Sequence, residues 1–238
     1  PVPAIATVGR ESDLALIGDY LQHPDHRLVS LVGPGGSGKT HLALEAGRQH
    51  VNAFQDGVYF VPLVGLASPT GVWSVIAQAL DLGFSKPAPG QTGAGIPSNL
   101  KAQLIAYLSK KKFLLILDNA EHLLAADSSE IDLREIITEL LTAAPGITVL
   151  ATSRTRLQML REQVIPVRGI AFQATGHSPS SPASVTPAMQ LFAHAAQRVS
   201  PEFAIASENA ESVATICRMV EGLPLAILLA AGWIEVLT

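Results

Sequence analysis

The sequence has a single cysteine, Cys217, among 238 residues. An intrachain disulfide needs two cysteines, so none can form, and such low cysteine usage is typical of proteins from a reducing cytoplasm. Cys217 lies on the apolar side of a helical pattern, which predicts a buried side chain and not a reactive thiol. The seven His residues and this one Cys show none of the spacings of a zinc site. We therefore expect a cytoplasmic protein without Cys/His-bound metal.

Charge is scarce as well, because only 15% of the residues are charged and the net charge is −4. No long run of Lys or Arg is present, so we expect no direct binding of nucleic acid by this chain. The longest apolar stretch, residues 223–234, is shorter than the ~18 residues of a membrane span and contains Pro224 and Gly232. No membrane crossing is expected. Hydrophobic residues still make up 48% of the chain, which excludes a disordered protein.

Short apolar runs alternate with helical periodicities along the first two thirds of the chain. This alternation predicts a parallel sheet covered by helices. The candidate strands span residues 27–32, 57–62, 113–117, 147–151 and 163–167. Their nearly continuous apolar character is typical of strands that are buried on both faces.

A Ser/Pro-rich stretch, residues 174–186, marks the predicted domain boundary. We expect an α/β nucleotide-binding domain over residues 1–173, a linker over 174–186 and a helical subdomain over 187–238. The chain begins at Pro1 with neither Met nor a leader-like segment, and it stops directly after an apolar helix. We therefore expect a module of a longer polypeptide, whose flanking domains are among its partners.

Residues 33–40 read GPGGSGKT and match the pattern G-x-x-x-x-G-K-[ST] between a predicted strand and a predicted helix. We call these residues the phosphate loop. Glycines let successive backbone N–H groups turn inward around an anion, and the helix that follows adds its positive N-terminal end. Lys39 is expected to reach the β- and γ-phosphates, and the Thr40 hydroxyl to bind Mg²⁺.

Five apolar residues, 113–117, end in Asp118, which predicts a buried strand that delivers a carboxylate to the ligand edge of the sheet. Asp118 would bind Mg²⁺ directly or through water. The next residue is Asn119, which cannot accept a proton, so we expect slow hydrolysis. Glu121 either reaches an attacking water or begins a solvated helix. Arg154 follows the strand 147–151 and could sense the γ-phosphate through its planar fork. The catalytic candidates are Lys39, Asp118, Glu121 and Arg154.

Five short motifs occur in a fixed order along the chain. They are Val8-Gly9-Arg10-Glu11, the phosphate loop, LILDNAEH at 115–122, Ala151-Thr152-Ser153-Arg154, and EGLPLA at 221–226. Together they resemble the STAND signal-transduction ATPases, which are related to NB-ARC domains, and most closely the nucleotide-binding oligomerisation modules of large bacterial transcriptional regulators. The resemblance extends from Thr7 to the C-terminus. The Gly-Leu-Pro-Leu-Ala stretch discriminates best, because generic phosphate-loop enzymes lack it.

The resemblance implies a five-stranded parallel P-loop NTPase sheet in the order 2-3-4-1-5, flanked by helices, with a helical subdomain that leans over the nucleotide. By position, Val8 and Arg10 would lie by the adenine or ribose, and Pro224 would pack on the base. It also implies ADP at rest, exchange for ATP, and nucleotide-dependent homo-oligomers. The expected nucleotide-binding set is Val8, Arg10, Gly35, Gly36, Ser37, Gly38, Lys39, Thr40, His41 and Pro224, with Thr40 and Asp118 as the Mg²⁺ ligands.

The first hypothesis for function is therefore an ATP/ADP-dependent switch with slow ATP hydrolysis, within a larger cytoplasmic signalling or transcription-regulating protein. The second hypothesis is a nucleotide-stabilised interaction scaffold without turnover, which Asn119 favours. A third, a phosphoryl transferase acting on a small molecule, would need an acceptor pocket and a base, and the sequence shows neither.

Overall fold

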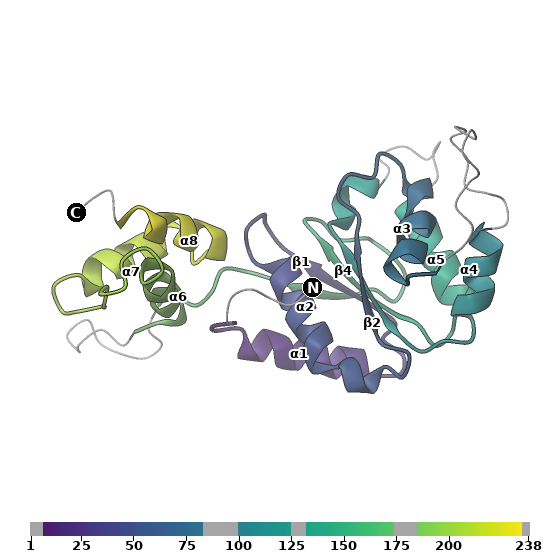
Figure 1. The fold of residues 1–238 in the computed structure, drawn as a ribbon. Coiled ribbons are helices and arrows are strands. Elements are labelled where there is room, and N and C mark those ends of the chain that lie inside the picture. Colours follow the sequence, from purple (N-terminus) through teal and green to yellow (C-terminus); the bar gives the residue numbers. More distant parts are fainter. Residues whose placement is uncertain (1–6, 83–99, 125–131, 174–184, 235–238) are drawn as a thin grey trace.

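Five parallel strands form the sheet of the α/β domain (Figure 1). The computed structural model describes residues 7–82, 100–124, 132–173 and 185–234. The strands are β1 (Leu28–Val32), β2 (Val58–Pro62), β3 (Leu114–Asp118), β4 (Thr148–Ser153) and β5 (Gln163–Pro166). Their order is β2-β3-β4-β1-β5, which confirms the predicted topology, with the strand before the phosphate loop between β4 and β5.

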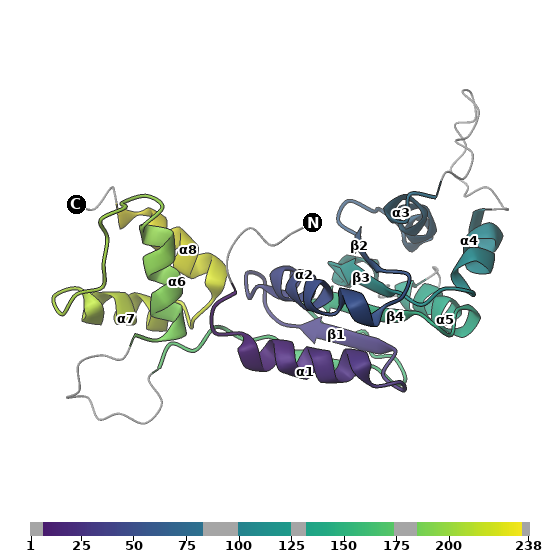
Figure 2. The ribbon, with the colours of Figure 1, turned by 60° about the horizontal axis from the view of Figure 1, so that its bottom comes forward.

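Helices cover both faces of this sheet (Figure 2). One face packs against α1 (Glu11–Gln22) and α2 (Lys39–Gln49), and the other against α3 (Val72–Ala79), α4 (Leu100–Leu108) and α5 (Leu133–Ala143). Along β3, Leu114 and Ile116 join the core under α1 and α2, whereas Leu115 and Leu117 join the opposite core. Because alternate side chains of a strand point to opposite faces, a central strand needs apolar residues at every position.

The carboxyl ends of the central strands bring polar residues to one edge of the sheet. Strand β4 continues two residues beyond the predicted strand, because Thr152 and Ser153 pair with Leu31 and Val32 of β1. Asp118 ends the neighbouring strand β3 at the same edge. The phosphate loop leaves β1 directly after Val32, so its residues lie next to this polar edge. This edge of the sheet therefore gathers the polar groups that could contact a ligand.

The helical subdomain consists of α6 (Pro187–Ala196), α7 (Ala210–Met219) and α8 (Pro224–Gly232) in the part of the chain that the structure describes. Met189, Phe192, Cys217 and Ile227 form the centre of its core. Burial raises the pKa of the Cys217 thiol to about 11, which agrees with the prediction of a buried, unreactive side chain. Most of the predicted linker, residues 174–184, lies outside the described residues.

Helix α8 carries most of the longest apolar stretch, yet it has only nine residues. Within the described ranges, no helix combines the length and the apolar character that crossing a membrane requires.

The α/β domain and the helical subdomain meet through their main chains. After β5, Ile170 donates its N–H to the carbonyl oxygen of Gly222 at 2.8 Å. A Cβ added at Gly169 would lie 2.0 Å from the carbonyl oxygen of Glu221, and one added at Gly222 would lie 2.1 Å from that of Ile170. Gly222 also has a φ of +67°, which side chains rarely adopt. Glycine is therefore required on both sides of this contact.

We expect Gly169→Ala to lower the free energy of unfolding by about 2 kcal/mol, because the new methyl group overlaps a main-chain oxygen that cannot rotate away. Thermal unfolding followed by circular dichroism measures the effect. Gly232→Ala is the control, since a Cβ added there meets no atom within 4 Å. Equal melting temperatures for Gly169→Ala and the wild type would contradict the close main-chain contact.

Candidate functional site

The phosphate loop turns its main chain around an open cavity of about 460 Å³. Gly36 has a φ of +79° and Gly38, the residue before α2, a φ of +90°. Side chains strongly disfavour this left-handed backbone, so glycine is needed at both positions. The loop and the first turn of α2 line the cavity from Gly35 to Leu42. A concave main-chain loop at a helix N-terminus is suited to hold an anion.

The Lys39 side chain reaches back from the end of the phosphate loop to its beginning. Its Nζ donates to the carbonyl oxygens of Gly33, at 2.8 Å, and Pro34, at 2.9 Å. Burial lowers the pKa of the Lys39 ammonium; Arg154 lowers it further, while the carboxylates of Glu121 and Asp118 raise it. Lys39 therefore provides a cation that the protein has partly withdrawn from water at the cavity wall.

A carboxylate and two hydroxyls meet beside the loop. The Thr40 and Thr152 hydroxyls each donate to Oδ1 of Asp118 at 2.7 Å, and Asp118 is only 8% exposed. Thr152 Oγ1 also accepts the N–H of Asn119 at 2.9 Å. Thr152 was not among the predicted site residues, although its place at the end of a strand beside Asp118 was a usable signal.

This group fits a Mg²⁺ ion that is bound together with phosphate. Among the described residues, no cluster of three or more His, Cys, Asp or Glu side chains could hold a metal by itself. Mg²⁺ commonly takes one or two protein oxygens and completes its shell with water and phosphate. The oxygens of Thr40 and Asp118 are within hydrogen-bonding distance of each other at the cavity edge, so they suit this kind of site.

Arg154 and Glu121 form an ion pair at the mouth of the cavity. Arg154 Nε lies 3.1 Å from Glu121 Oε1, and the Arg154 N–H donates to Oε2 at 3.3 Å. Both carboxylate oxygens of Glu121 are therefore engaged by one residue. Asn119 precedes this turn with a φ of +64°, a conformation that Asn tolerates better than most residues. The Arg154 side chain is 66% exposed and reaches toward Gly35.

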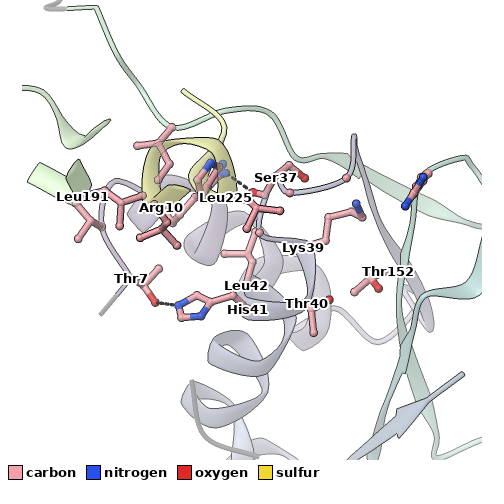
Figure 3. A pocket seen from close by; sticks show the side chains of 18 of the residues that line it. Thr7, Arg10, Ser37, Lys39, Thr40, His41, Leu42, Thr152, Leu191 and Leu225 are labelled. Atoms are coloured by element: carbon pink, nitrogen blue, oxygen red, sulfur yellow. Dashed lines mark hydrogen bonds between the residues drawn. The ribbon is translucent and has the colours of Figure 1, made fainter. Parts of the chain in front are cut away.

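The other end of the cavity is apolar and is formed by five separate segments (Figure 3). They are residues 7–10, the first turn of α2, the residues after β5, helix α6 and helix α8. Thr7 Oγ1 lies 3.1 Å from His41 Nε2, in a hydrogen bond that closes one side. The lining residues that the sequence did not predict are Thr7, Leu42, Asn119, Thr152, Ile170, Leu191, Leu225 and Leu228. The leucines among them lie on helices, where lining residues and core residues follow the same periodicity.

All ten residues of the predicted nucleotide-binding set line this one cavity. Of the catalytic candidates, Lys39, Glu121 and Arg154 line it as well. Asp118 lies directly behind the lining residue Thr40, whose hydroxyl donates a hydrogen bond to it. The side chain of Arg10 takes an unexpected position, because its guanidinium is bonded to protein oxygens of three segments. Helix α8 also reaches the loop itself: the Leu225 N–H donates to the Gly36 carbonyl oxygen at 3.2 Å.

Comparison with known sequences identifies a relative and a family. A putative HTH-type transcriptional regulator of Mycobacterium tuberculosis (strain ATCC 25618 / H37Rv) is 36% identical over 208 residues, which are 87% of this chain and 20% of the relative. The chain thus spans about a fifth of the length of that relative. The model of the AAA domain family matches residues 23–163, more than half of the chain.

Comparison with solved structures shows the fold. Cdc6p from Pyrobaculum aerophilum superposes with a TM-score of 0.58 at 17% identity, covering 95% of this chain and 61% of that one. A Signal Transduction ATPase with Numerous Domains from Pyrococcus horikoshii, which has a tetratricopeptide repeat sensor, superposes with a TM-score of 0.54 at 16% identity, covering 95% and 30%. With this fold and the matched sequence model, the chain belongs to the AAA domain family of P-loop NTPases.

Proposed function

We propose that this chain binds ATP and ADP with Mg²⁺ and acts as a nucleotide-dependent switch within a larger regulatory protein. The observation that carries the proposal is the cavity itself, which has a main-chain loop and Lys39 at one end and an apolar lining from the helical subdomain at the other. A polyphosphate suits the first end and a base the second. The cavity volume of about 460 Å³ is within the usual range for small-molecule sites.

Each residue has a distinct part in this proposal. The inward N–H groups of the loop hold the phosphates, and Lys39 exchanges its two carbonyl acceptors for phosphate oxygens. Thr40 and Asp118 hold Mg²⁺, which neutralises charge on the phosphates when it is bound. Val8 and Pro224 line the apolar end, where the base would pack, and His41 closes it together with Thr7.

Hydrolysis is slow in this proposal, because Asp118 and Glu121, the two acids beside the phosphate loop in the described part of the chain, are both engaged by other side chains. Asn119 follows Asp118 and cannot act as a base. The next acid along the chain is Glu121, and both of its carboxylate oxygens contact Arg154. Arg154 senses the γ-phosphate from the mouth of the cavity. The same contacts favour the second candidate function, a nucleotide-stabilised scaffold that never turns over.

We place the chain in the STAND class, with an NB-ARC-like subdomain arrangement. Support comes from the order of the five motifs and from α8, whose first turn reaches Gly36 of the phosphate loop. The relative of the chain is named a putative transcriptional regulator, so regulation of transcription by the whole protein is part of the proposal. Nucleotide-dependent homo-oligomers and contacts with flanking domains would transmit the signal. The net charge of −4 supports a role without direct nucleic-acid binding.

Lys39→Ala tests the phosphate end of the cavity. We expect the affinity for ADP and ATP to fall at least tenfold, because the cation at the cavity wall is lost. Isothermal titration calorimetry gives both dissociation constants. Lys110→Ala removes the same charge from an exposed position after α4, and its affinities should equal those of the wild type. Wild-type affinity in Lys39→Ala would refute nucleotide binding at this loop.

Asp118→Asn tests the metal ligands. The amide keeps an oxygen for the Thr40 and Thr152 hydroxyls but loses the charge that attracts Mg²⁺. We expect Mg²⁺ to strengthen ATP binding in the wild type, and at least nine tenths of that gain to disappear in the variant. Titrations of ATP with Mg²⁺ and with EDTA measure it. A variant that keeps the full gain would show that Mg²⁺ binds elsewhere.

Single-turnover hydrolysis separates the two candidate functions. With protein in excess over radiolabelled ATP, we expect slow release of phosphate that Asp118→Ala abolishes. Release at the background rate of the buffer, combined with normal ATP affinity, would instead establish the scaffold function.

A further inference from the structure

The outward carbonyl groups of the phosphate loop receive hydrogen bonds from side chains and from other segments of the chain. A loop that turns N–H groups inward around an anion turns carbonyl oxygens outward, and buried carbonyls are nearly always paired. Lys39 Nζ donates hydrogen bonds to the carbonyl oxygens of Gly33 and Pro34, while the Leu225 N–H donates to that of Gly36. Ser37 receives its donor from Arg10, whose Nη2 lies 2.7 Å from the Ser37 oxygen.

The Arg10 guanidinium is buried, and its Nη2 donates both of its hydrogens to protein oxygens. Arg10 is 7% exposed, and its Nη2 donates to the carbonyl oxygens of Ser37 and Arg168, the latter at 2.6 Å. An Nη group carries two hydrogens, so none remains on Nη2 for a nucleotide. Nη1 donates to Asp13 at 2.8 Å, which balances the buried charge and fixes the side chain.

We infer that Arg10 is a positioning residue of the phosphate subsite, which acts through the loop and not on the base or ribose. The peptide bond between Ser37 and Gly38 is planar and trans, so its C=O and N–H point in opposite directions. Because Arg10 holds the Ser37 oxygen outward, the Gly38 N–H is turned the other way, and Gly38 lines the cavity. This inference rests on the proposed nucleotide binding. It states that Arg10 strengthens the binding of the phosphates and does not contribute to the binding of the base or ribose.

The second acceptor of Arg10 extends this control to the helical subdomain. Arg168 immediately precedes the main-chain contact of Gly169 and Ile170 with residues 221–222. Helix α8 begins two residues after Gly222, and its Leu225 N–H returns to Gly36, the neighbour of Ser37. These contacts therefore connect two adjacent residues of the phosphate loop, Ser37 and Gly36, through Arg10 on one side and α8 on the other. Through them, Arg10 links the binding of phosphate to the contact between α8 and the phosphate loop.

The test compares ADP with inorganic pyrophosphate, which has phosphates but neither base nor ribose. We expect Arg10→Met, which keeps the length of the side chain without its donors, to weaken binding of both probes at least tenfold and by the same factor. Arg168→Met is the matched control, because it removes one exposed cation nearby and leaves the carbonyl acceptor in place. Its affinities should stay within twofold of the wild type.

Arg10→Lys covers the case in which Arg10→Met does not fold, as judged by circular dichroism. An ammonium keeps the charge but cannot serve acceptors on two segments with a planar fork. We expect a smaller loss, of about threefold, that is again equal for ADP and pyrophosphate.

A loss for ADP alone, in either folded variant, would place Arg10 on the base or ribose and overturn the inference. Unchanged affinities in Arg10→Lys and Arg10→Met would overturn it as well. If the wild type bound neither probe, the proposed function itself would fail, which is a separate outcome.

Discussion

A loop that binds an anion through its amides depends on what holds its carbonyls in the opposite direction. Here those carbonyls accept hydrogen bonds from Lys39 within the loop, from Arg10 before α1 and from Leu225 of α8. Two of these donors come from segments about 30 and 190 residues away along the chain. The shape of the phosphate loop is therefore a property of the whole domain, and the local GxxxxGK[ST] sequence is only part of its cause.

The sheet explains why the chemical groups meet. Parallel strands end at a common edge, so the apolar runs that build β3 and β4 also deliver Asp118 and Thr152 to Thr40. Burial on both faces demands the apolar runs, and the ends of those runs are the first positions where polar residues are tolerated. Stability and function thus constrain different residues of the same strands.

The strands and the loop could be predicted from the sequence, because apolar runs and glycine patterns are local signals, whereas the strand order followed only from the resemblance of the five motifs. The ion pair between Glu121 and Arg154 could not be predicted, since it joins the turns after two different strands, and the first of these turns begins at the left-handed Asn119. Arg10 lines the cavity, and its bonds to Ser37 and Arg168 are set by tertiary packing that no spacing encodes. Leu191 and Leu228 could not be predicted as lining residues, because lining and core residues of a helix share one periodicity.

The main-chain contact at Gly169 and Gly222 has a consequence for how quickly the two parts of the molecule could separate. Interlocked side chains must leave their rotamers together before two packed surfaces part, which makes such joints slow and sensitive to substitution. At Gly169 and Gly222 main-chain atoms meet main-chain atoms, and turning about this contact would break the bond from Ile170 to Gly222 together with the bond from Leu225 to Gly36. The two glycines are therefore the positions at this joint that tolerate no side chain.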